Sequence, residues 1–236
     1  MKVDLHTHTI ASGHAWGTLF ENAQEAKKQG IELLGLTEHG PAVLGSVTKN
    51  YFNATKRVPQ NINGVRILFG VETNIIDEQG NLDLENKILE KLDIVILGFH
   101  YNCGYVDQGI EKNTRVLIRA MHNPYVKMLA HPYRSVMKID IKNITKEAIK
   151  KNILLEINAS CFSEHKIKVE KIEGIKTMIK ILKNNNQKMV ISSDAHNPYE
   201  VGNFSNVVAK FDELDLSEDD LLNNDPGAIL KFFNIS

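Results

Sequence analysis

The sequence is poor in cysteine, has no long apolar run and carries no excess of charge of one sign. Cys103 and Cys161 are the only two cysteines among 236 residues. Two cysteines cannot form a disulfide framework, so we expect free thiols, and a structural zinc site built on thiolates is excluded. No apolar run reaches the roughly 18 residues that a membrane span requires, so we expect no membrane association.

The sequence also lacks an export signal and a basic surface charge. Residues Asp4 and His6 stand where a signal peptide needs an apolar stretch, so we expect a cytoplasmic protein. The 28 basic and 29 acidic residues leave a net charge of −1. This balance gives no electrostatic reason to expect nucleic acid as a partner. Hydrophobic residues make up 42% of the chain, which excludes a disordered or low-complexity protein.

Short apolar runs alternate with longer amphipathic stretches along the whole chain. The runs are apolar on both faces, which is typical of buried parallel strands. We expect strands at Lys2–His6, Leu33–Thr37, Arg66–Glu72, Ile94–Phe99, Val126–Ala130, Leu154–Asn158 and Lys188–Ser192. We expect helices at Thr18–Gln29, Leu84–Leu92, Thr114–Met121, Lys146–Lys151, Gly174–Asn184, Asn206–Leu214 and Pro226–Phe233.

Seven strand-then-helix units predict a parallel sheet with right-handed crossovers. No linker, repeat or change of composition divides the chain, so we expect a single domain over residues 1–236 with the α/β fold of one (β/α)7 barrel, closed or nearly closed. An open doubly wound sheet is the alternative, but no Gly-x-Gly-x-x-Gly motif follows the first strand to support nucleotide binding.

Histidine is abundant, with nine residues, and three of them fall within the first fourteen positions. Six of the seven expected strands end in an imidazole or carboxylate. Because parallel strands of a barrel end in one ring, we expect these side chains to meet there. Asp4, His6 and His8 are expected on one side of the first strand, since side chains alternate. The predicted metal ligands are His6, His8, His14, His39, Glu72, His100, His131, Asp194 and His196.

Nine ligands are too many for one tetrahedral zinc ion and suit two or three ions that share bridging carboxylates. Imidazole and carboxylate together favour zinc, manganese or iron over magnesium or calcium. We therefore expect divalent metal ions, with zinc as the first choice and manganese or iron as alternatives.

Several motifs resemble those of the PHP (polymerase and histidinol phosphatase) family, and in particular its stand-alone YcdX-like phosphatase branch. They are Asp4-Leu5-His6-Thr7-His8, Thr37-Glu38-His39-Gly40-Pro41, Gly70-Val71-Glu72, Gly98-Phe99-His100, His131-Pro132 and Ser193-Asp194-Ala195-His196. The resemblance implies a distorted seven-stranded barrel, a centre of three metal ions and hydrolysis of phosphoesters.

By this resemblance, His6 and His8 hold the first metal together with Glu72 and Asp194. Glu72 bridges to a second metal, which His100 binds with His131. The third metal is held by His14, His39 and His196. The family usually has aspartate where this chain has Glu38. Its YcdX-like branch often follows the His-Pro pair with Gly-Asn-Pro, where this chain has Tyr133-Arg134-Ser135, a difference that bears on the substrate pocket.

The expected reaction is hydrolysis of small phosphate monoesters by a hydroxide that bridges two metals, while a third metal binds the phosphoryl oxygens. We assign Glu72, Asp194 and His196 to the catalytic machinery. Arg134 is the candidate for phosphate binding, because guanidinium matches phosphate bidentately, with a surface arginine as the alternative. Asp4 is expected either to accept a hydrogen bond from a ligand imidazole or to cap the strand end.

Other residues and functions stay open. Asn158 and Ser160 are candidates to line the pocket, Trp16 either walls it or packs beneath it, and His122 and His165 are expected on the surface. A nuclease or phosphodiesterase of the same fold is one alternative function, and a non-catalytic metal-binding PHP module is another. A metal-dependent amidohydrolase is a third, although such barrels bridge their metals through a modified lysine on the fourth strand.

Overall fold

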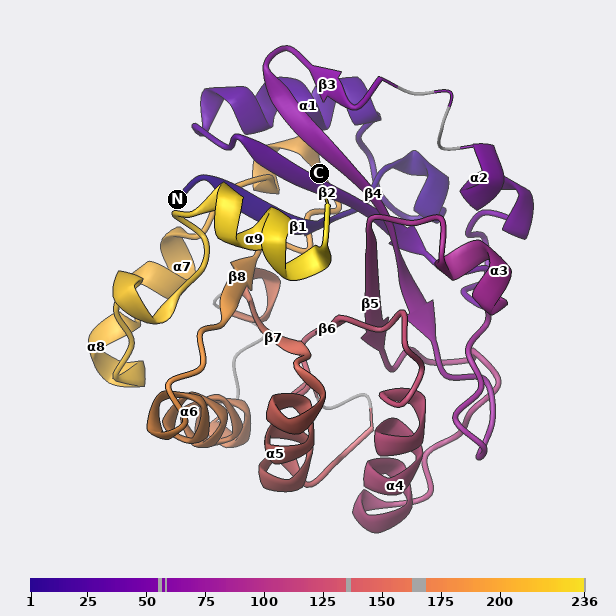
Figure 1. Ribbon diagram of the computed structural model, residues 1–236, viewed down its shortest axis with the longest axis vertical. Coiled ribbons are helices and arrows are strands. Elements are labelled where there is room, and N and C mark those ends of the chain that lie inside the picture. The colour runs from indigo at the N-terminus through magenta and orange to yellow at the C-terminus, as the bar shows by residue number, and fades with distance from the viewer. Residues whose placement is uncertain (55–56, 58, 135–136, 163–168, 236) are drawn as a thin grey trace.

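A nearly closed barrel of seven parallel strands forms the centre of the molecule (Figure 1). The computed structural model describes residues 1–54, 57, 59–134, 137–162 and 169–235. The strands follow the order β1-β2-β4-β5-β6-β7-β8, and a short β3 pairs antiparallel with β4. Their bounds are β1 Val3–Thr7, β2 Leu33–His39, β3 Asn61–Ile62, β4 Val65–Asn74, β5 Ile94–Gly98, β6 Met128–Leu129, β7 Leu154–Asn158 and β8 Val190–Ser192. This architecture confirms the predicted α/β barrel.

Helices surround the strands (Figure 1). Their bounds are α1 Leu19–Lys28, α2 Lys49–Ala54, α3 Asn86–Leu89, α4 Ile110–Ala120, α5 Ile141–Lys151, α6 Val169–Asn184, α7 Ser205–Val208, α8 Phe211–Leu214 and α9 Pro226–Phe233. Helix α1 begins with a capping box, in which Thr18 accepts from the backbone of Glu21 and the Glu21 carboxylate accepts in return. The sequence prediction missed α2 and β3, merged α7 with α8, and started α4, α5 and α6 four or five residues too late.

A buried asparagine closes the seam between the first and last strands. The side-chain amide of Asn223 donates to the carbonyls of Val3 and Ile191, and its oxygen accepts from the backbone N–H of Ile191. Further along the seam, Thr7 forms a parallel bridge with Ala195. Because β1 and β8 are joined in this way, the carboxyl ends of all seven strands form one ring.

The barrel interior is apolar at one end and polar at the other. Its apolar end is filled by residues such as Leu68 and Leu154, on which Ile229 and Phe233 of α9 pack. Side chains two or four residues further along a strand point to the same side, so Glu72 lies above Leu68 and Glu156 above Leu154. The barrel interior therefore consists of an apolar layer and, toward the carboxyl ends of the strands, a layer of buried acidic and imidazole side chains.

A bulge in β1 separates Asp4 from the histidines. Asp4 pairs with Leu34 and Thr7 pairs with Leu36, so three steps along β1 match two along β2. Gly35 accommodates this bulge, because a Cβ there would lie 2.3 Å from the carbonyl oxygen of Leu5. The alternation expected from the sequence is therefore broken, and Asp4 does not share a side with the imidazole of His6.

Candidate metal centre

All nine side chains predicted as metal ligands gather at the carboxyl end of the barrel. Their nitrogen and oxygen atoms form three groups, and within each group the atoms lie no more than 4.8 Å apart. These groups are His6, His8 and Asp194, then His8, His39 and His196, and finally His39, Glu72 and His100. His131 joins them through Glu72, and His14 through His39 and His196.

Glu72 lies at the middle of the cluster and is fully buried. Its Oε1 faces the Nε2 atoms of His100 and His131 at 3.2 and 3.1 Å. Its Oε2 faces His6 Nε2 at 3.3 Å and His39 Nδ1 at 2.8 Å. One carboxylate thus presents each of its oxygens to a different group of imidazoles, as a bridging ligand does.

The two oxygens of Asp194 have different partners: one faces the imidazoles and the other accepts hydrogen bonds from neutral side chains. Its Oδ1 lies 3.2 Å from His8 Nε2 and 3.6 Å from His6 Nε2. Its Oδ2 accepts hydrogen bonds from Asn158 at 3.2 Å and Ser160 at 3.2 Å. The protein therefore fixes the carboxylate by one oxygen and leaves the other facing the imidazoles.

The spacing of these atoms suits divalent cations. Nε2 of His14 lies 3.3 Å from Nε2 of His39 and 3.0 Å from Nε2 of His196. Ligands of a tetrahedral ion with bonds of about 2.0–2.1 Å lie about 3.4 Å apart. Among the described residues, both oxygens of Glu72 and Nε2 of His100 and His131 are buried without a hydrogen-bond partner. Such orphaned atoms are costly in a protein interior unless a cation satisfies them.

Several imidazoles of the cluster are held through the ring nitrogen that points away from it. Nδ1 of His6 lies 2.8 Å from Oε1 of Glu156, and Nδ1 of His100 lies 2.7 Å from Oδ1 of Asn74. Nδ1 of His8 contacts the hydroxyl of Ser12 at 3.1 Å. These partners fix the ring orientation and leave the Nε2 lone pair available for a cation.

Glu156 contacts two of the predicted ligands but is not among the residues that the sequence predicts for the site, because the expected strand Leu154–Asn158 is the one that does not end in an imidazole or carboxylate. It is fully buried, and its Oε2 accepts from the backbone N–H of His131 at 2.8 Å and from Asn158 at 3.0 Å. The available signal was an acidic residue inside the apolar run Leu154–Asn158, since a buried charge requires partners.

Asp4 does not have the imidazole partner that was one of its two expected roles. Its carboxylate accepts from the backbone N–H and hydroxyl of Ser193 at 3.0 and 2.6 Å, and from Gly202 N–H at 2.9 Å. It also contacts the backbone of His6, and no ring nitrogen within the described residues bonds to it. The bulge in β1 is the reason, because it turns Asp4 toward the loop after β8.

Glu38 supports the cluster from outside, as the residue before His39. Its carboxylate accepts from the Thr9 hydroxyl and, at 2.5 Å, from the Ser12 hydroxyl that contacts His8. Glu38, where the family usually has aspartate, thus helps to hold the imidazole of His8 in place through Ser12.

Burial and charge set the protonation of the cluster. Burial lowers the pKa of His6, but the carboxylates of Glu72 and Glu156 outweigh it and raise this pKa well above its usual value. Burial raises the pKa of Glu72, yet His100 and His6 hold it well below its usual range. Burial lowers the pKa of His8 well below its usual value. An ionised carboxylate among buried imidazoles is an arrangement that attracts cations.

Two of the nine residues have left-handed backbone conformations. His131 has φ 29° and Asp194 has φ 54°, in a region that non-glycine residues rarely adopt. Each lies two residues beyond the end of a strand, β6 and β8 respectively, and they turn their side chains toward Glu72 and His8. Strained backbone of this kind gathers at functional sites.

The remaining candidates lie around the opening of the cluster. Arg134 Nη1 lies 3.4 Å from Asp194 Oδ2, so this arginine reaches the centre. Trp16 is 82% exposed and does not pack beneath the site. His122 lies on the surface beside Glu147, and His165 falls outside the described residues. Cys103 and Cys161 are free and buried, as expected.

Comparison with known proteins identifies relatives along almost the whole chain. The model of the PHP domain matches residues 4–160. A probable phosphatase of Thermoanaerobacter sp. strain X514 is 41% identical over 232 residues, which cover 98% of this chain and 94% of that protein. A probable phosphatase of Clostridium novyi strain NT is 38% identical over 98% of this chain and 93% of its own length.

Two solved structures share the fold at low sequence identity. The histidinol phosphate phosphatase of Lactococcus lactis, complexed with zinc, L-histidinol and phosphate, has a TM-score of 0.64 at 16% identity. The alignment covers 92% of this chain and 94% of that one. A chain of archaeal ribonuclease P with mature tRNA has a TM-score of 0.65 at 15% identity, over 98% and 91% of the two chains. Across the described residues, no helix is both long and apolar enough to cross a membrane.

Proposed function

The chain belongs to the PHP domain family, and on this premise we propose that it hydrolyses small phosphate monoesters as a metal-dependent phosphatase with three divalent ions. We propose that the catalytic unit is a single PHP domain over residues 1–236. The observation that carries the proposal is the position of Glu72, whose two buried oxygens face different groups of imidazoles.

The distances support the following division of ligands. His6 and His8 would hold one ion together with Asp194 Oδ1, from which they lie 3.6 and 3.2 Å away. Glu72 Oε2, which lies 3.3 Å from His6 and 3.6 Å from His8, would complete the site of this ion. His100 and His131 would hold a second ion with Glu72 Oε1. The three rings of His14, His39 and His196 would hold the third, at the more exposed side of the cluster.

When bound, such ions lower the pKa of coordinated water and neutralise the charge of a phosphoryl group. The protein's own residues supply position and charge. Asp194 is held by Asn158 and Ser160, so its free oxygen keeps a fixed direction. Arg134 directs a guanidinium toward the same edge of the cluster, where it can bind two oxygens of a phosphoryl group bidentately. Glu72, Asp194 and His196 are the proposed catalytic ligands.

The donor set favours zinc. Imidazole nitrogens outnumber carboxylate oxygens in the cluster, and this mixture suits zinc, with manganese or iron as the metals next in preference. The zinc in the phosphatase of Lactococcus lactis supports the same choice.

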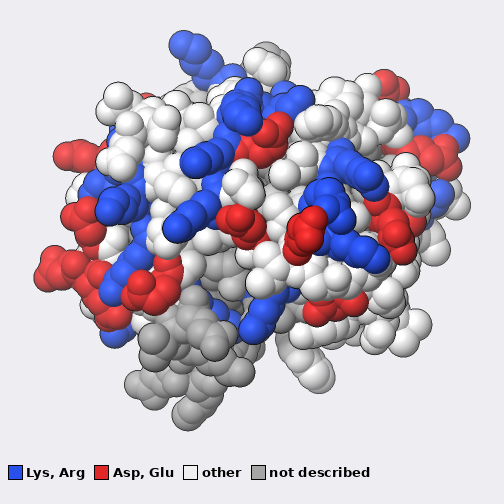
Figure 2. Space-filling model, turned by 90° about the horizontal axis from the view of Figure 1, so that it is seen from below, with Lys and Arg blue, Asp and Glu red and all other residues white. Residues whose placement is uncertain are grey.

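Surface charge favours a small substrate over nucleic acid. Seen from the side of α4, α5 and α6, Lys and Arg are interspersed with Asp and Glu (Figure 2). Pairs such as Arg115 with Glu111 and Lys150 with Glu147 account for this mixture. A protein that tracks a phosphate backbone needs a continuous basic stripe, whereas acidic side chains interrupt the basic ones among the described residues of this face.

The proposal is tested by metal content and turnover together. Elemental analysis of the purified protein is expected to find three ions per chain, and phosphate release from 4-nitrophenyl phosphate should exceed hydrolysis of bis(4-nitrophenyl) phosphate. A chelator should abolish both metal and turnover. Glu72→Gln should lose activity, whereas Glu111→Gln on the exposed face of α4 should keep it. One ion or none, or faster hydrolysis of the diester, would overturn the proposal.

A further inference from the structure

A cavity of about 490 Å³ lies beside Arg134 at the edge of the proposed metal centre, lined by residues 132–134 and 137–139, by the first residues of α4 and α5, and by α6. We propose that this cavity holds the alcohol part of the substrate and selects phosphate monoesters whose alcohol carries a second anionic group, either a carboxylate or a phosphate. The inference rests on the proposed phosphatase function and adds the class of substrate.

Arg134 connects the cavity to the centre. Its side chain lines the cavity and also reaches Asp194 Oδ2 at 3.4 Å. The next wall residue, Tyr133, accepts a hydrogen bond from the backbone N–H of Asn158 at 2.6 Å, and Asn158 in turn donates to Asp194. A phosphoryl group held at the centre by Arg134 would therefore place its alcohol beside a side chain that also lines the cavity.

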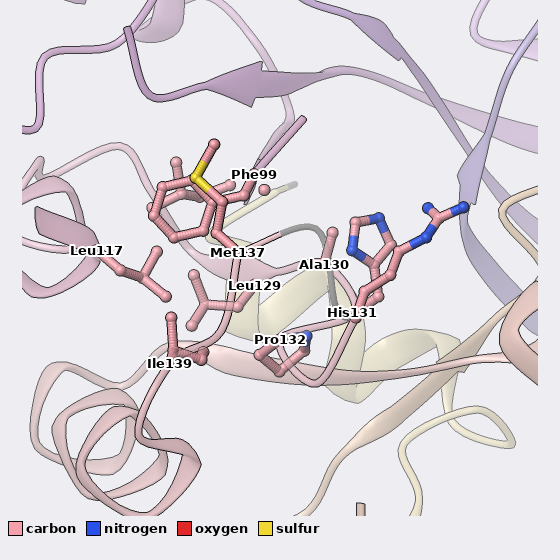
Figure 3. A pocket seen from close by; sticks show the side chains of 11 residues that line it. Phe99, Leu117, Leu129, Ala130, His131, Pro132, Met137 and Ile139 are labelled. Carbon is pink, nitrogen blue, oxygen red and sulfur yellow. The ribbon is translucent and has the colours of Figure 1, made fainter. Parts of the chain in front are cut away.

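One wall of the large cavity is apolar. Pro132, Met137 and Ile139 line the large cavity and also a smaller one of about 20 Å³ beside His131. Figure 3 shows Met137 and Ile139 on the side of Phe99 and Leu117, whereas the ring of His131 lies on the opposite side of the view. The smaller cavity has room for about one water molecule at most, so the larger one is the space for a ligand.

The charges of the large cavity are of one sign. Arg134, Lys138 and Lys171 line it, and no acidic residue does so among the described part of the chain. The exposed Asp107 lies outside the lining, and hydrogen bonds from Asn113 and Gly109, followed by the charge of Lys138, lower its pKa. The volume falls within the range of about 300–1,000 Å³ that small-molecule sites occupy. An apolar wall with cationic groups fits an organic body that ends in an anion.

Gly174 keeps the cavity open. It lies inside α6, where glycine weakens a helix relative to alanine. A Cβ at this position would meet only Cβ of Tyr133, at the ordinary contact distance of 3.4 Å. Neither backbone conformation nor a steric clash requires glycine here. Its effect is to leave space above Tyr133 in the cavity wall.

The charge is tested with three esters of equal chain length and the metal-loaded enzyme. These are butyl phosphate, the phosphate ester of 4-hydroxybutanoate and 1,4-butanediol bisphosphate. At least one anionic ester should exceed butyl phosphate in kcat/KM by about tenfold, the effect of one charge-assisted contact. The two anionic esters distinguish a carboxylate from a phosphate as the preferred group. Lys138→Gln should reduce the preference severalfold, while Lys142→Gln, an exposed lysine outside the cavity lining, should not change it.

The role of the cavity volume is tested by placing a larger side chain in its lining at Gly174. Gly174→Leu should lower the ratio of kcat/KM for the four-carbon anionic esters to that for ethyl phosphate, whereas Gly174→Ala should have a smaller effect on this ratio. Equal kcat/KM values for butyl phosphate and both anionic esters, or an unchanged ratio in Gly174→Leu, would overturn the inference. If the leucine variant does not fold, Lys138→Gln still decides the matter.

The two proposals fail in different ways. Absence of turnover for every ester by the metal-loaded enzyme would overturn the proposed function. Calorimetry with butylphosphonate and 4-phosphonobutanoate, which are not hydrolysed, then tests the cavity by binding alone. We expect 4-phosphonobutanoate to bind more tightly than butylphosphonate, and we expect Lys138→Gln to remove this difference. Equal binding of the two phosphonates by the unchanged protein would overturn the inference.

Discussion

Replacing Glu156 by glutamine tests whether a side chain that binds no metal itself controls the metal centre. In the structure, one oxygen of Glu156 faces His6 Nδ1 at 2.8 Å and the other accepts from the backbone N–H of His131 at 2.8 Å. A glutamine has one oxygen and one NH2 group, so it cannot accept on both sides. Either His131 N–H faces a donor, or His6 must take the tautomer that carries its proton on Nε2.

Both outcomes have a cost that can be worked out. A proton on His6 Nε2 removes that lone pair from metal binding, and loss of such a supporting partner typically weakens metal affinity by about 10–100-fold, or roughly 1.4–2.7 kcal/mol. If the amide instead faces His131, an unsatisfied buried N–H costs about 1–3 kcal/mol of folding stability. We therefore expect weaker metal binding, lower stability or both, with kcat/KM reduced in proportion to the metal lost.

The assay titrates metal from the protein with a competing chelator and follows thermal unfolding of the metal-free form. Glu147→Gln is the matched control, since Glu147 contacts only Lys150 and His122 at the surface among the described residues. Metal affinity and unfolding temperature of Glu156→Gln that both equal those of the unchanged protein would refute the reasoning.

Four further changes test other parts of the structure. Glu72→Gln should abolish turnover and reduce the number of bound ions, and full metal content with normal turnover would contradict its bridging role. Gly98→Ala places a Cβ 3.1 Å from Glu72 Oε1 and 3.2 Å from His100 Cε1, so it should displace both side chains and lower kcat/KM about tenfold or more. Unchanged kinetics would show that turnover does not depend on the exact positions of Glu72 and His100. Asn223→Ala removes three buried hydrogen bonds at the barrel seam and should lower the free energy of unfolding by ~2–4 kcal/mol in urea titrations; a loss below ~1 kcal/mol would argue against this seam as a source of stability. Arg134→Ala should raise KM more than it lowers kcat, and an unchanged KM would remove this arginine from the substrate site.

The limits of the sequence prediction are clearest in β1. Alternation correctly places His6 and His8 together, because both follow the bulge and lie on the same side. It fails for Asp4, since the bulge depends on a contact between Leu5 and Gly35 in the neighbouring strand. A rule that uses only spacing within one strand has no access to that contact.

The same limit explains Glu156 and the extent of β6. Glu156 stands in an apolar run as a single acidic residue, and its partners, His6 and the backbone of His131, are distant in the sequence. Strand β6 pairs over only Met128–Leu129, although the apolar run around it is longer, because pairing depends on the neighbouring strands β5 and β7. Cross-strand partners therefore decide both features.

The amino-acid sequence by itself determined the barrel and the identity of the clustered side chains. Apolar runs buried on both faces predict parallel strands, and the chemistry of a strand end is local to that strand. Only the tertiary structure decided how those ends meet. It determines which oxygen of Glu72 faces which imidazole and which partners hold each ring. It also places Arg134 both against Asp194 and in the lining of the cavity. The physical reason is that these relations join residues from different strands, and their distances exist only once the barrel has closed.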